Sequence, residues 1–324
     1  MATNEGSEAV VHSLEDLTGL AFALLRAIGQ PEIKRRYQLY VPAVFKAICL
    51  NADSVLRLHP MSVFYTDAGK PLWNPLATAG LARMLMEACV DLHYFAGRDV
   101  TEDEREFRGI VADIQRVRAR MRTADWMDGE RAAGRAPNLP EPDSPQTRDL
   151  AWVSKRTREL LPDGLAFWLA QLEGNGYFKD LPPAEQKAWR TGRFPKRTHR
   201  KQRNGYALSR TERAHSAGIP AWVHTAVYGL LSEYTHTSAK GLDRIFWFQP
   251  FDWVAIASQI SLPVSFCCGF VAHAALEFVE VFPACKSQLN SELSLLLGHW
   301  RGYITRPGAD QSDQSGIDKG GSPC

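Results

Sequence analysis

The chain has 324 residues, of which 45% are hydrophobic and 23% are charged, and its formal net charge is +2. These values are ordinary for a globular protein, and they exclude a disordered or fibrous chain. Residues 1–11 carry Glu5 and Glu8 in place of the basic start and short apolar run of a secretory signal. We therefore expect a cytoplasmic protein with a packed core.

Helical periodicity begins near the N-terminus. A helix is expected over residues 14–27, because a capping box begins at Ser13 and apolar residues then follow at helical intervals. Pro31 suits the first position of a helix, so a second helix is expected from there to about Leu58, with a bend at Pro42.

The next two expected helices have different surroundings. Residues 76–96 are apolar on nearly every side, which places this helix in the centre of the fold. Residues 101–122 are dense in charge and have only a narrow apolar stripe, which is typical of a surface helix.

The second half of the chain alternates between proline-rich or glycine-rich stretches and helical patterns. Long loops are expected over 129–145 and 174–204. The expected helices are 150–161, 165–172, 219–238, 253–281 and 287–300. Few stretches alternate in the manner of a strand, so the sequence predicts an all-α fold, an irregular multi-helix bundle with long loops.

Three regions are expected along the chain. Residues 1–75 form an N-terminal helical region packed on the core, and residues 76–302 form the main helical domain. A basic insert occupies 176–213 of that domain, and 303–324 form a disordered tail rich in Gly, Ser and Asp.

The uncharged stretch 254–276 has the length of a transmembrane helix, so a membrane span is one interpretation. However, the stretch contains polar residues such as Gln259 and His273, and Glu277 and Glu280 continue its helical pattern. A buried core helix fits these polar residues better, and no membrane partner is expected.

A stripe of charge lies on the apolar helix 76–96. Arg83, Glu87 and Asp91 are four residues apart and therefore share one face. We expect these charges to be buried or to line a cavity. Burying them costs several kcal/mol per ion unless they are paired, so the stripe is either a salt bridge of the core or part of a functional cleft.

A second polar stripe combines Tyr228, Ser232 and His236, again four residues apart. An imidazole beside hydroxyl groups can carry protons near neutral pH, although a lone histidine in a helix is more often a packing residue. If the two stripes face each other, they form one catalytic site, whose expected residues are Arg83, Glu87, Tyr228, Ser232 and His236.

A metal site is the alternative for the same stripes, with Glu87, Asp91 and His236 as ligands. A di-metal bundle would require further Glu-x-x-His pairs on facing helices besides these residues, and the six cysteines lack the spacing of zinc ligands. No metal and no other cofactor is therefore expected.

Basic residues are concentrated between Arg190 and Arg213, where Glu212 is the only acidic residue. Aromatic residues are interleaved with them, as on surfaces that bind phosphates and stack on unpaired bases. RNA or another nucleic acid is the expected partner, and the alternative is a solvated loop that pairs with acidic surface elsewhere. The expected nucleic-acid-binding residues are Arg193, Lys196, Arg197, Arg200, Lys201 and Arg203.

The arrangement resembles a bacterial helical family of unknown function whose members are similar to HEPN domains, the helical domains of ribonuclease toxins and phage-defence proteins. The resemblance rests on the stretch 81–94, which contains Arg83 and Glu87, and on the stretch 209–238. It covers about residues 76–240 and implies a HEPN-like core with a metal-independent ribonuclease site.

The resemblance also implies roles for individual residues. A HEPN ribonuclease is expected to carry an Arg shortly before its catalytic His, but Gly229, Leu230 and Leu231 stand before His236. Arg83 would then replace that Arg from a neighbouring helix and stabilise phosphate charge. His236 would act as general acid or base, and Glu87 would orient Arg83.

Three hypotheses about function remain open. The first is a nucleic-acid-directed protein of bacterial defence or stress response, with a metal-independent ribonuclease as its catalytic version. The second is a non-catalytic helical module that docks an acidic partner, and the third is a small-molecule enzyme that uses the same polar cleft. A protein partner such as an antitoxin, or a second copy of the chain, is compatible with the first two hypotheses.

Overall fold

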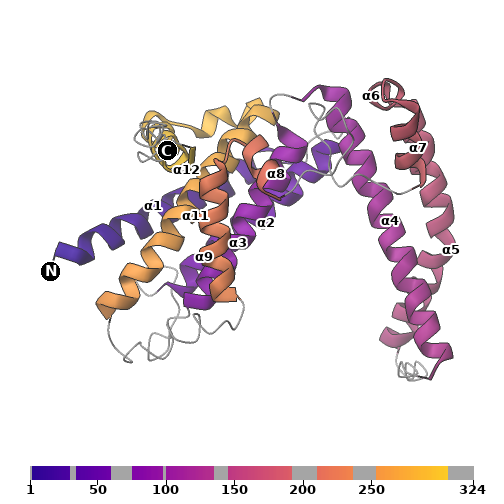
Figure 1. Ribbon diagram of the computed structural model, residues 1–324, viewed down its shortest axis with the longest axis horizontal. Coiled ribbons are helices and arrows are strands. Elements are labelled where there is room, and N and C mark those ends of the chain that lie inside the picture. Colours follow the sequence, from indigo (N-terminus) through magenta and orange to yellow (C-terminus); the bar gives the residue numbers. More distant parts are fainter. Residues whose placement is uncertain are drawn as a thin grey trace, which may run out of the picture. The chain divides into compact units, whose positions relative to one another are not determined.

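The computed structural model describes residues 2–29, 34–59, 75–97, 100–134, 145–191, 210–235 and 253–305. Within these ranges every regular element is a helix and no strand occurs, so the all-α prediction is confirmed (Figure 1). The chain divides into two compact units. The first comprises Met1–Glu32, Val41–Arg98 and Leu208–Cys324, and the second comprises Ile33–Tyr40 and Asp99–Ala207.

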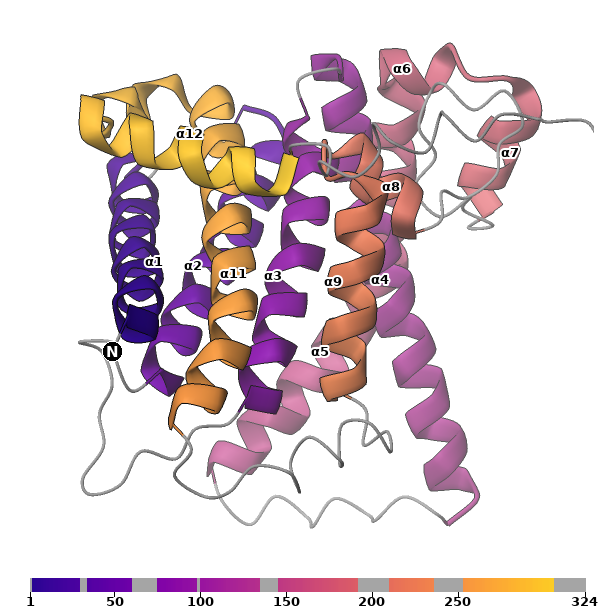
Figure 2. The same ribbon diagram turned by 60° about the vertical axis from the view of Figure 1, so that its left-hand side comes forward.

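The first unit is built around its most apolar helix, α11. This helix packs against α1, α3 and α12, and α3 in turn packs against α9 (Figure 2). The helices of this unit are α1 (Ala2–Ala27), α2 (Tyr37–Leu58, whose first four residues belong to the second unit), α3 (Pro75–Ala96), α8 (Arg210–Ser216), α9 (Ala221–Thr235), α11 (Trp253–Val281), the 3₁₀ helix η1 (Pro283–Gln288) and α12 (Ser291–Thr305).

The core of the first unit consists mainly of aliphatic side chains together with stacked phenylalanines. Phe45 of α2 stacks on Phe278 of α11 with their ring centroids 4.1 Å apart. Both rings are fully buried, and a large aromatic area removed from water on each side explains why α2 docks on α11.

Two helical segments are long and apolar enough to cross a membrane, Tyr37–Leu58 and Ser261–Val281. Length and composition alone are weak evidence, because the core helix of a globular protein passes the same test. In the first segment 39% of the most apolar window is buried inside the protein, and in the second 89% is buried.

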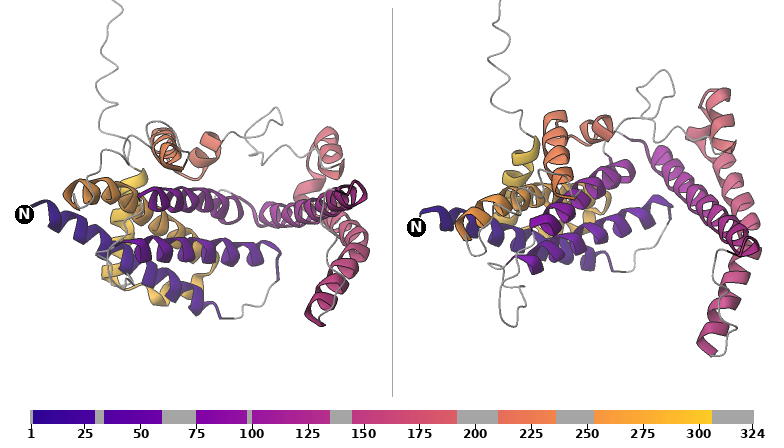
Figure 3. Two further views of the ribbon diagram at one scale, coloured as in Figure 1. Left: turned by 90° about the horizontal axis from the view of Figure 1, so that it is seen from below. Right: turned by 60° about the horizontal axis from the view of Figure 1, so that its bottom comes forward.

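The second unit consists of two long helices with two short ones at one end. The helices are α4 (Glu102–Ala132), α5 (Pro145–Gly174), α6 (Gly176–Lys179) and α7 (Pro183–Thr191). α4 packs on α5, and both can be followed in the two views of Figure 3. Their shared core contains Phe107, Ile110, Val111, Ile114, Leu172, Phe178 and Trp189.

A buried carboxylate ties the start of α2 to α4 within the second unit. Asp113 is fully buried and accepts hydrogen bonds from Arg36, Arg116 and the hydroxyl of Tyr40, the last at 2.9 Å. The guanidinium of Arg36 also lies over the ring of Trp168, 4.6 Å from its centroid. A buried charge of this kind is tolerated because it is both paired and hydrogen-bonded.

The structure corrects the expected start of the first helix. α1 begins at Ala2 and not at residue 14. Ser13 lies inside this helix, and its hydroxyl donates a hydrogen bond to the carbonyl of Ala9 at 2.9 Å. The capping-box interpretation was wrong because a serine hydroxyl can bond back to the carbonyl four residues earlier instead of capping a helix.

The other boundaries also differ from the sequence expectations. α2 begins at Tyr37, after the expected start at Pro31, and α4 continues for ten residues beyond the expected end at 122. α5 is one continuous helix where two short ones were expected, with Pro162 inside it. Buried leucines on both sides of this proline, Leu161 and Leu172, hold the two halves in place, so packing overrides the local breaker.

The stretch 174–204 was expected to be irregular, but its first part is helical. Asn175 accepts a hydrogen bond from the backbone N–H of Phe178 and so caps α6, and α7 follows with Trp189 buried in the core. The last helix is α12, which runs further toward the C-terminus than the expected 287–300. Residues 129–132 of the expected loop 129–145 belong instead to α4, and residues 135–144 lie outside the described residues. Of the expected disordered tail 303–324, residues 303–305 are helical in α12, and residues 306–324 lie outside the described residues.

Candidate functional site

The two polar stripes predicted from the sequence meet where α3 packs against α9, within the first unit. Nη2 of Arg83 donates a hydrogen bond to the hydroxyl of Tyr228 at 2.5 Å. The guanidinium carbon of Arg83 also lies 4.3 Å from the centroid of the Tyr228 ring. The expectation that these two stripes face each other therefore holds for this pair.

The charged stripe on α3 is only partly buried. The side chain of Arg83 is 19% exposed and that of Glu87 is 50% exposed, with 3.4 Å between Nε of Arg83 and Oε1 of Glu87. The expectation of buried charge was wrong for Glu87, because the helix turns this position toward solvent. Arg83 is thus a half-buried cation with a carboxylate on its open side.

The structure adds an imidazole that the sequence analysis did not select. The ring of His224 stacks on that of Tyr228, with centroids 5.5 Å apart and an angle of 19° between the planes. Nδ1 of His224 lies 3.3 Å from the hydroxyl oxygen of Thr211 on α8. His224 is 7% exposed, so its ring is held between the hydroxyl and the phenol.

The signal for His224 was present in the sequence. It stands four residues before Tyr228, so the stripe of Tyr228, Ser232 and His236 extends one turn further toward the N-terminus. We name Arg83, Glu87, Thr211, His224 and Tyr228 the α3–α9 cluster. It combines a cation, an imidazole and a phenol on facing helices.

The remaining predicted site residues are not tested by the geometry. Ser232 belongs to α9, but its side chain is not among those described, and His236 lies outside the described residues. The same is true of the predicted nucleic-acid-binding residues Arg193, Lys196, Arg197, Arg200, Lys201 and Arg203. Their roles stay predictions.

No protein-family model, no curated protein and no solved structure matches this chain. Inference about its function therefore rests on the chemistry of its own residues.

A second polar group lies inside the first unit, between α3 and α11. Nδ1 of His93 is 2.5 Å from Oε1 of Glu277, and Nε2 of His273 is 3.6 Å from the same oxygen. A carboxylate accepts hydrogen bonds, so His93 carries a proton on Nδ1. We name these residues the His–Glu–His cluster.

Burial affects the charge state of His273. His273 is 3% exposed, and neither of its ring nitrogens has a hydrogen-bond partner among the described groups. Burial lowers the pKa of His273, and the charges of Arg301 and His93 lower it further, whereas Glu277 and the carbonyl of Ala217 act in the opposite direction. His273 is therefore a neutral imidazole at neutral pH.

The chemistry of the described side chains does not point to a metal. Across the part of the chain that the structure describes, no three His, Cys, Asp or Glu residues are arranged to hold an ion. The contact between His93 and Glu277 is a hydrogen bond, in which the imidazole donates and the carboxylate accepts.

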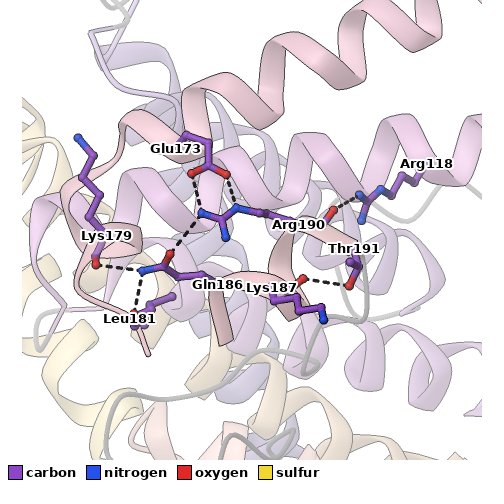
Figure 4. Close-up of polar contacts among 8 residues, drawn as sticks. All are labelled: Arg118, Glu173, Lys179, Leu181, Gln186, Lys187, Arg190 and Thr191. Atoms are coloured by element: carbon purple, nitrogen blue, oxygen red, sulfur yellow. Dashed lines mark hydrogen bonds and ion pairs between the residues drawn. The ribbon is translucent and has the colours of Figure 1, made fainter. Parts of the chain in front are cut away.

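The predicted basic segment begins directly after a firmly anchored helix, α7 (Figure 4). The guanidinium of Arg190 on α7 binds both carboxylate oxygens of Glu173 on α5. Arg118 of α4 donates a hydrogen bond at 2.7 Å to the carbonyl of Arg190, near the end of α7. A cation at a helix C-terminus satisfies a carbonyl that has no partner within the helix.

Proposed function

We propose that this chain is a nucleic-acid-directed protein of bacterial defence or stress response and that its α3–α9 cluster cleaves RNA without a metal. The observation that carries the proposal is the placement of three complementary groups. Arg83 contacts Tyr228 at 2.5 Å, and His224 stacks on the same phenol. A guanidinium can stabilise phosphoryl charge, and an imidazole and a phenol can transfer protons, which are the tasks of metal-independent phosphodiester transfer.

In the proposed reaction the 2′-hydroxyl of a ribose attacks the adjacent phosphorus. The bond from phosphorus to the 5′-oxygen breaks, which gives a 2′,3′-cyclic phosphate and a 5′-hydroxyl. The imidazole accepts the proton of the attacking hydroxyl, and a second acid returns one proton to the leaving oxygen. Tyr228 is suited to that second role because its hydroxyl is half-buried and already held by Arg83.

Arg83 and Glu87 have different parts in this proposal. The guanidinium of Arg83 stabilises the negative charge that grows on the phosphoryl oxygens. Glu87 is a positioning residue, because its carboxylate lies 3.4 Å from Nε of Arg83 and would repel a phosphate that approached it directly.

Two imidazoles compete for the role of general base. His224 is described and lies against Tyr228, whereas His236 is three helical turns further along the same predicted stripe. The resemblance to HEPN domains favours His236, and the contacts of His224 favour His224. Separate substitutions of the two histidines distinguish these assignments.

The test is cleavage of end-labelled single-stranded RNA by purified full-length protein in the presence of EDTA. We expect His224→Asn and Arg83→Gln each to lower the cleavage rate by about 100-fold or more. His215→Asn, which changes an exposed histidine of α8, should leave the rate unchanged. Normal cleavage by H224N together with loss in H236N would assign the base to His236.

Absence of cleavage by the wild-type protein would remove the ribonuclease proposal. The second candidate, a non-catalytic module that docks an acidic partner, is favoured by the same ion pair. Arg83 is only 19% exposed and already contacts both Glu87 and Tyr228, which is also what a structural latch between α3 and α9 requires. If this second candidate is correct, the wild-type protein should cleave no RNA. R83Q should then only lower the thermal stability.

A further inference from the structure

The C-terminal half of α4 is a basic surface that the sequence analysis treated only as the outside of a surface helix. No acidic residue lies between Asp113 and Asp125. Four arginines occupy this stretch, namely Arg116, Arg118, Arg120 and Arg122. Arg116 is neutralised by Asp113, but the other three are further along the helix.

Two of these arginines form a row with a tryptophan. Arg118, Arg122 and Trp126 are four residues apart, and since α4 continues to Ala132 they lie on one flank of the same helix. Arg122 is exposed, and the Trp126 side chain is 62% exposed. We name these three residues the α4 row.

An indole as exposed as that of Trp126 contributes little to the fold, because most of its apolar surface remains in water. Tryptophan and arginine are both enriched at binding surfaces relative to the rest of a protein surface. Trp126 is therefore better explained by a partner than by packing.

Stability accounts for Arg118, which donates a hydrogen bond to the carbonyl of Arg190, but it does not account for Arg122. Like charges four residues apart on a helix repel each other. Burial lowers the pKa of Arg118, and the neighbouring charge of Arg122 lowers it further. Among the described residues Arg122 forms no ion pair, so the repulsion is not relieved by a nearby carboxylate, although Asp125 is one turn away. An anionic ligand would relieve it.

The α4 row lies next to the start of the predicted basic segment. The guanidinium of Arg118 bonds to the carbonyl of Arg190, and α7 ends one residue later at Thr191 (Figure 4). Arg193, the first residue of that segment, follows two positions further on. The ion pair of Arg190 with Glu173 holds the end of α7 beside α5.

We infer that the α4 row is a binding surface for single-stranded RNA, on which Arg118 and Arg122 contact phosphates and one base stacks on Trp126. The inference rests on the proposed function, because the binding surface and the cleavage site are both assigned RNA as their ligand. It assigns RNA affinity to the second unit, whereas cleavage is assigned to the first.

The tryptophan distinguishes RNA from an acidic protein. An acidic polypeptide would pair with the guanidinium groups and gain nothing specific from an indole face. Single-stranded RNA uses both, because every base has a face that stacks on an aromatic ring. Stacking is tolerant of sequence, so the row should bind RNA with little sequence preference.

The test is binding of a fluorescein-labelled single-stranded RNA of about 20 nucleotides to the full-length protein in EDTA, followed by anisotropy. We expect Trp126→Ala to weaken binding about tenfold, which is the usual effect of losing one stacked base. Arg122→Gln should weaken binding and reduce the slope of log Kd against log salt by about one. Phe167→Ala, an exposed aromatic of α5, and Lys46→Gln, an exposed cation of α2, are the matched controls and should bind as the wild type does.

Several outcomes would overturn the inference. Binding by W126A and R122Q within twofold of the wild type would remove the α4 row, even if cleavage still required His224. Competition by polyglutamate as effective as competition by unlabelled RNA would indicate an acidic protein as the partner. Loss of binding in W126A and R122Q, with cleavage by the wild type absent, would support the α4 row and remove the ribonuclease proposal.

Discussion

His93 and Glu277 are hydrogen-bonded at 2.5 Å between α3 and α11, although 184 residues separate them in the sequence. Their side chains are 12% and 10% exposed, so the bond lies in the interior of the first unit. Polar groups at such a depth destabilise a fold when they lose their partner, because water cannot replace it. The pair therefore links α3 to the correct position along α11.

Glu277→Ala should lower the free energy of unfolding by about 3 kcal/mol or more, since it leaves two imidazoles in the core without their carboxylate. Urea denaturation at pH 7 measures the change. Glu280→Ala, at an exposed position one turn further along α11, is the control and should cost less than 1 kcal/mol. Replacing His93 and Glu277 together by leucine should restore most of the loss. Equal effects of E277A and E280A would contradict this account.

Acid should destabilise the first unit through its buried histidines. Burial lowers the pKa of His59 to about 4 and also lowers that of His273. Below a pH of about 6.5 the unfolded chain takes up protons that the folded chain does not, so the free energy of unfolding falls as the pH decreases toward 4. The contribution of His59 alone is about 3 kcal/mol.

The check is the pH dependence of urea denaturation between pH 7.5 and 4. His59→Gln should flatten the curve below pH 6.5, and His215→Gln, which changes an exposed histidine, should leave it as steep as in the wild type. A wild-type curve that is level over this range would show that these imidazoles are not held neutral.

Sequence patterns predicted the polar stripes but only part of their surroundings. Helical spacing placed Arg83 and Tyr228 each on a defined face, and the structure brings these faces together. His224 was missed because the stripe was begun one turn too late. Periodicity assigns a residue to a face correctly but does not state where the functional part of that face begins.

The sequence contained only part of the His–Glu–His cluster. His273 and Glu277 are four residues apart and therefore share one face of a helix, but His93 stands on another helix and no local pattern connects it to these two. Only the docking of α3 on α11 brings them together, and that docking depends on the shapes of many side chains and not on a local pattern. The predicted boundaries of α5 were wrong for a similar reason. Packing of buried leucines on both sides of Pro162 outweighed a residue that breaks isolated helices.

Alanine substitutions at two glycines, one on α11 and one on α12, should change the stability in opposite directions. A Cβ added at Gly269 would lie 2.3 Å from Cγ2 of the fully buried Ile304, whereas one added at Gly298 would meet nothing within 4 Å. Gly269→Ala should therefore destabilise the protein by about 1 to 3 kcal/mol through overpacking. Gly298→Ala should stabilise it by about 0.5 to 1 kcal/mol, because alanine is the better helix former.

Thermal denaturation of the two variants measures both effects. A gain in stability from G269A would mean that α12 does not rest on α11 at this point. A loss from G298A would mean that the exposed face of α12 is covered by another part of the protein.

Two asparagines cap helices in different surroundings and should therefore contribute different amounts to the free energy of unfolding. The side chain of Asn175 accepts from the N–H of Phe178 and donates to the carbonyl of Asp103, both at 3.0 Å, and Asn175 is 8% exposed. Asn290 is exposed, and its side chain accepts from the N–H of Leu293 at 2.8 Å. Asn175→Ala thus removes a cap and also the hydrogen bond from Asn175 to the carbonyl of Asp103.

We expect Asn175→Ala to cost about 2 kcal/mol and Asn290→Ala about 1 kcal/mol, in line with the usual worth of a helix cap and of a part-buried hydrogen bond. Urea denaturation of both variants gives the comparison. Because Asn175 joins the start of α6 to α4, its loss should also increase hydrogen exchange at the N–H of Phe178, whereas Asn290→Ala should increase exchange only in the first turn of α12. Similar exchange at Phe178 in the wild type and in N175A would contradict the role of this cap.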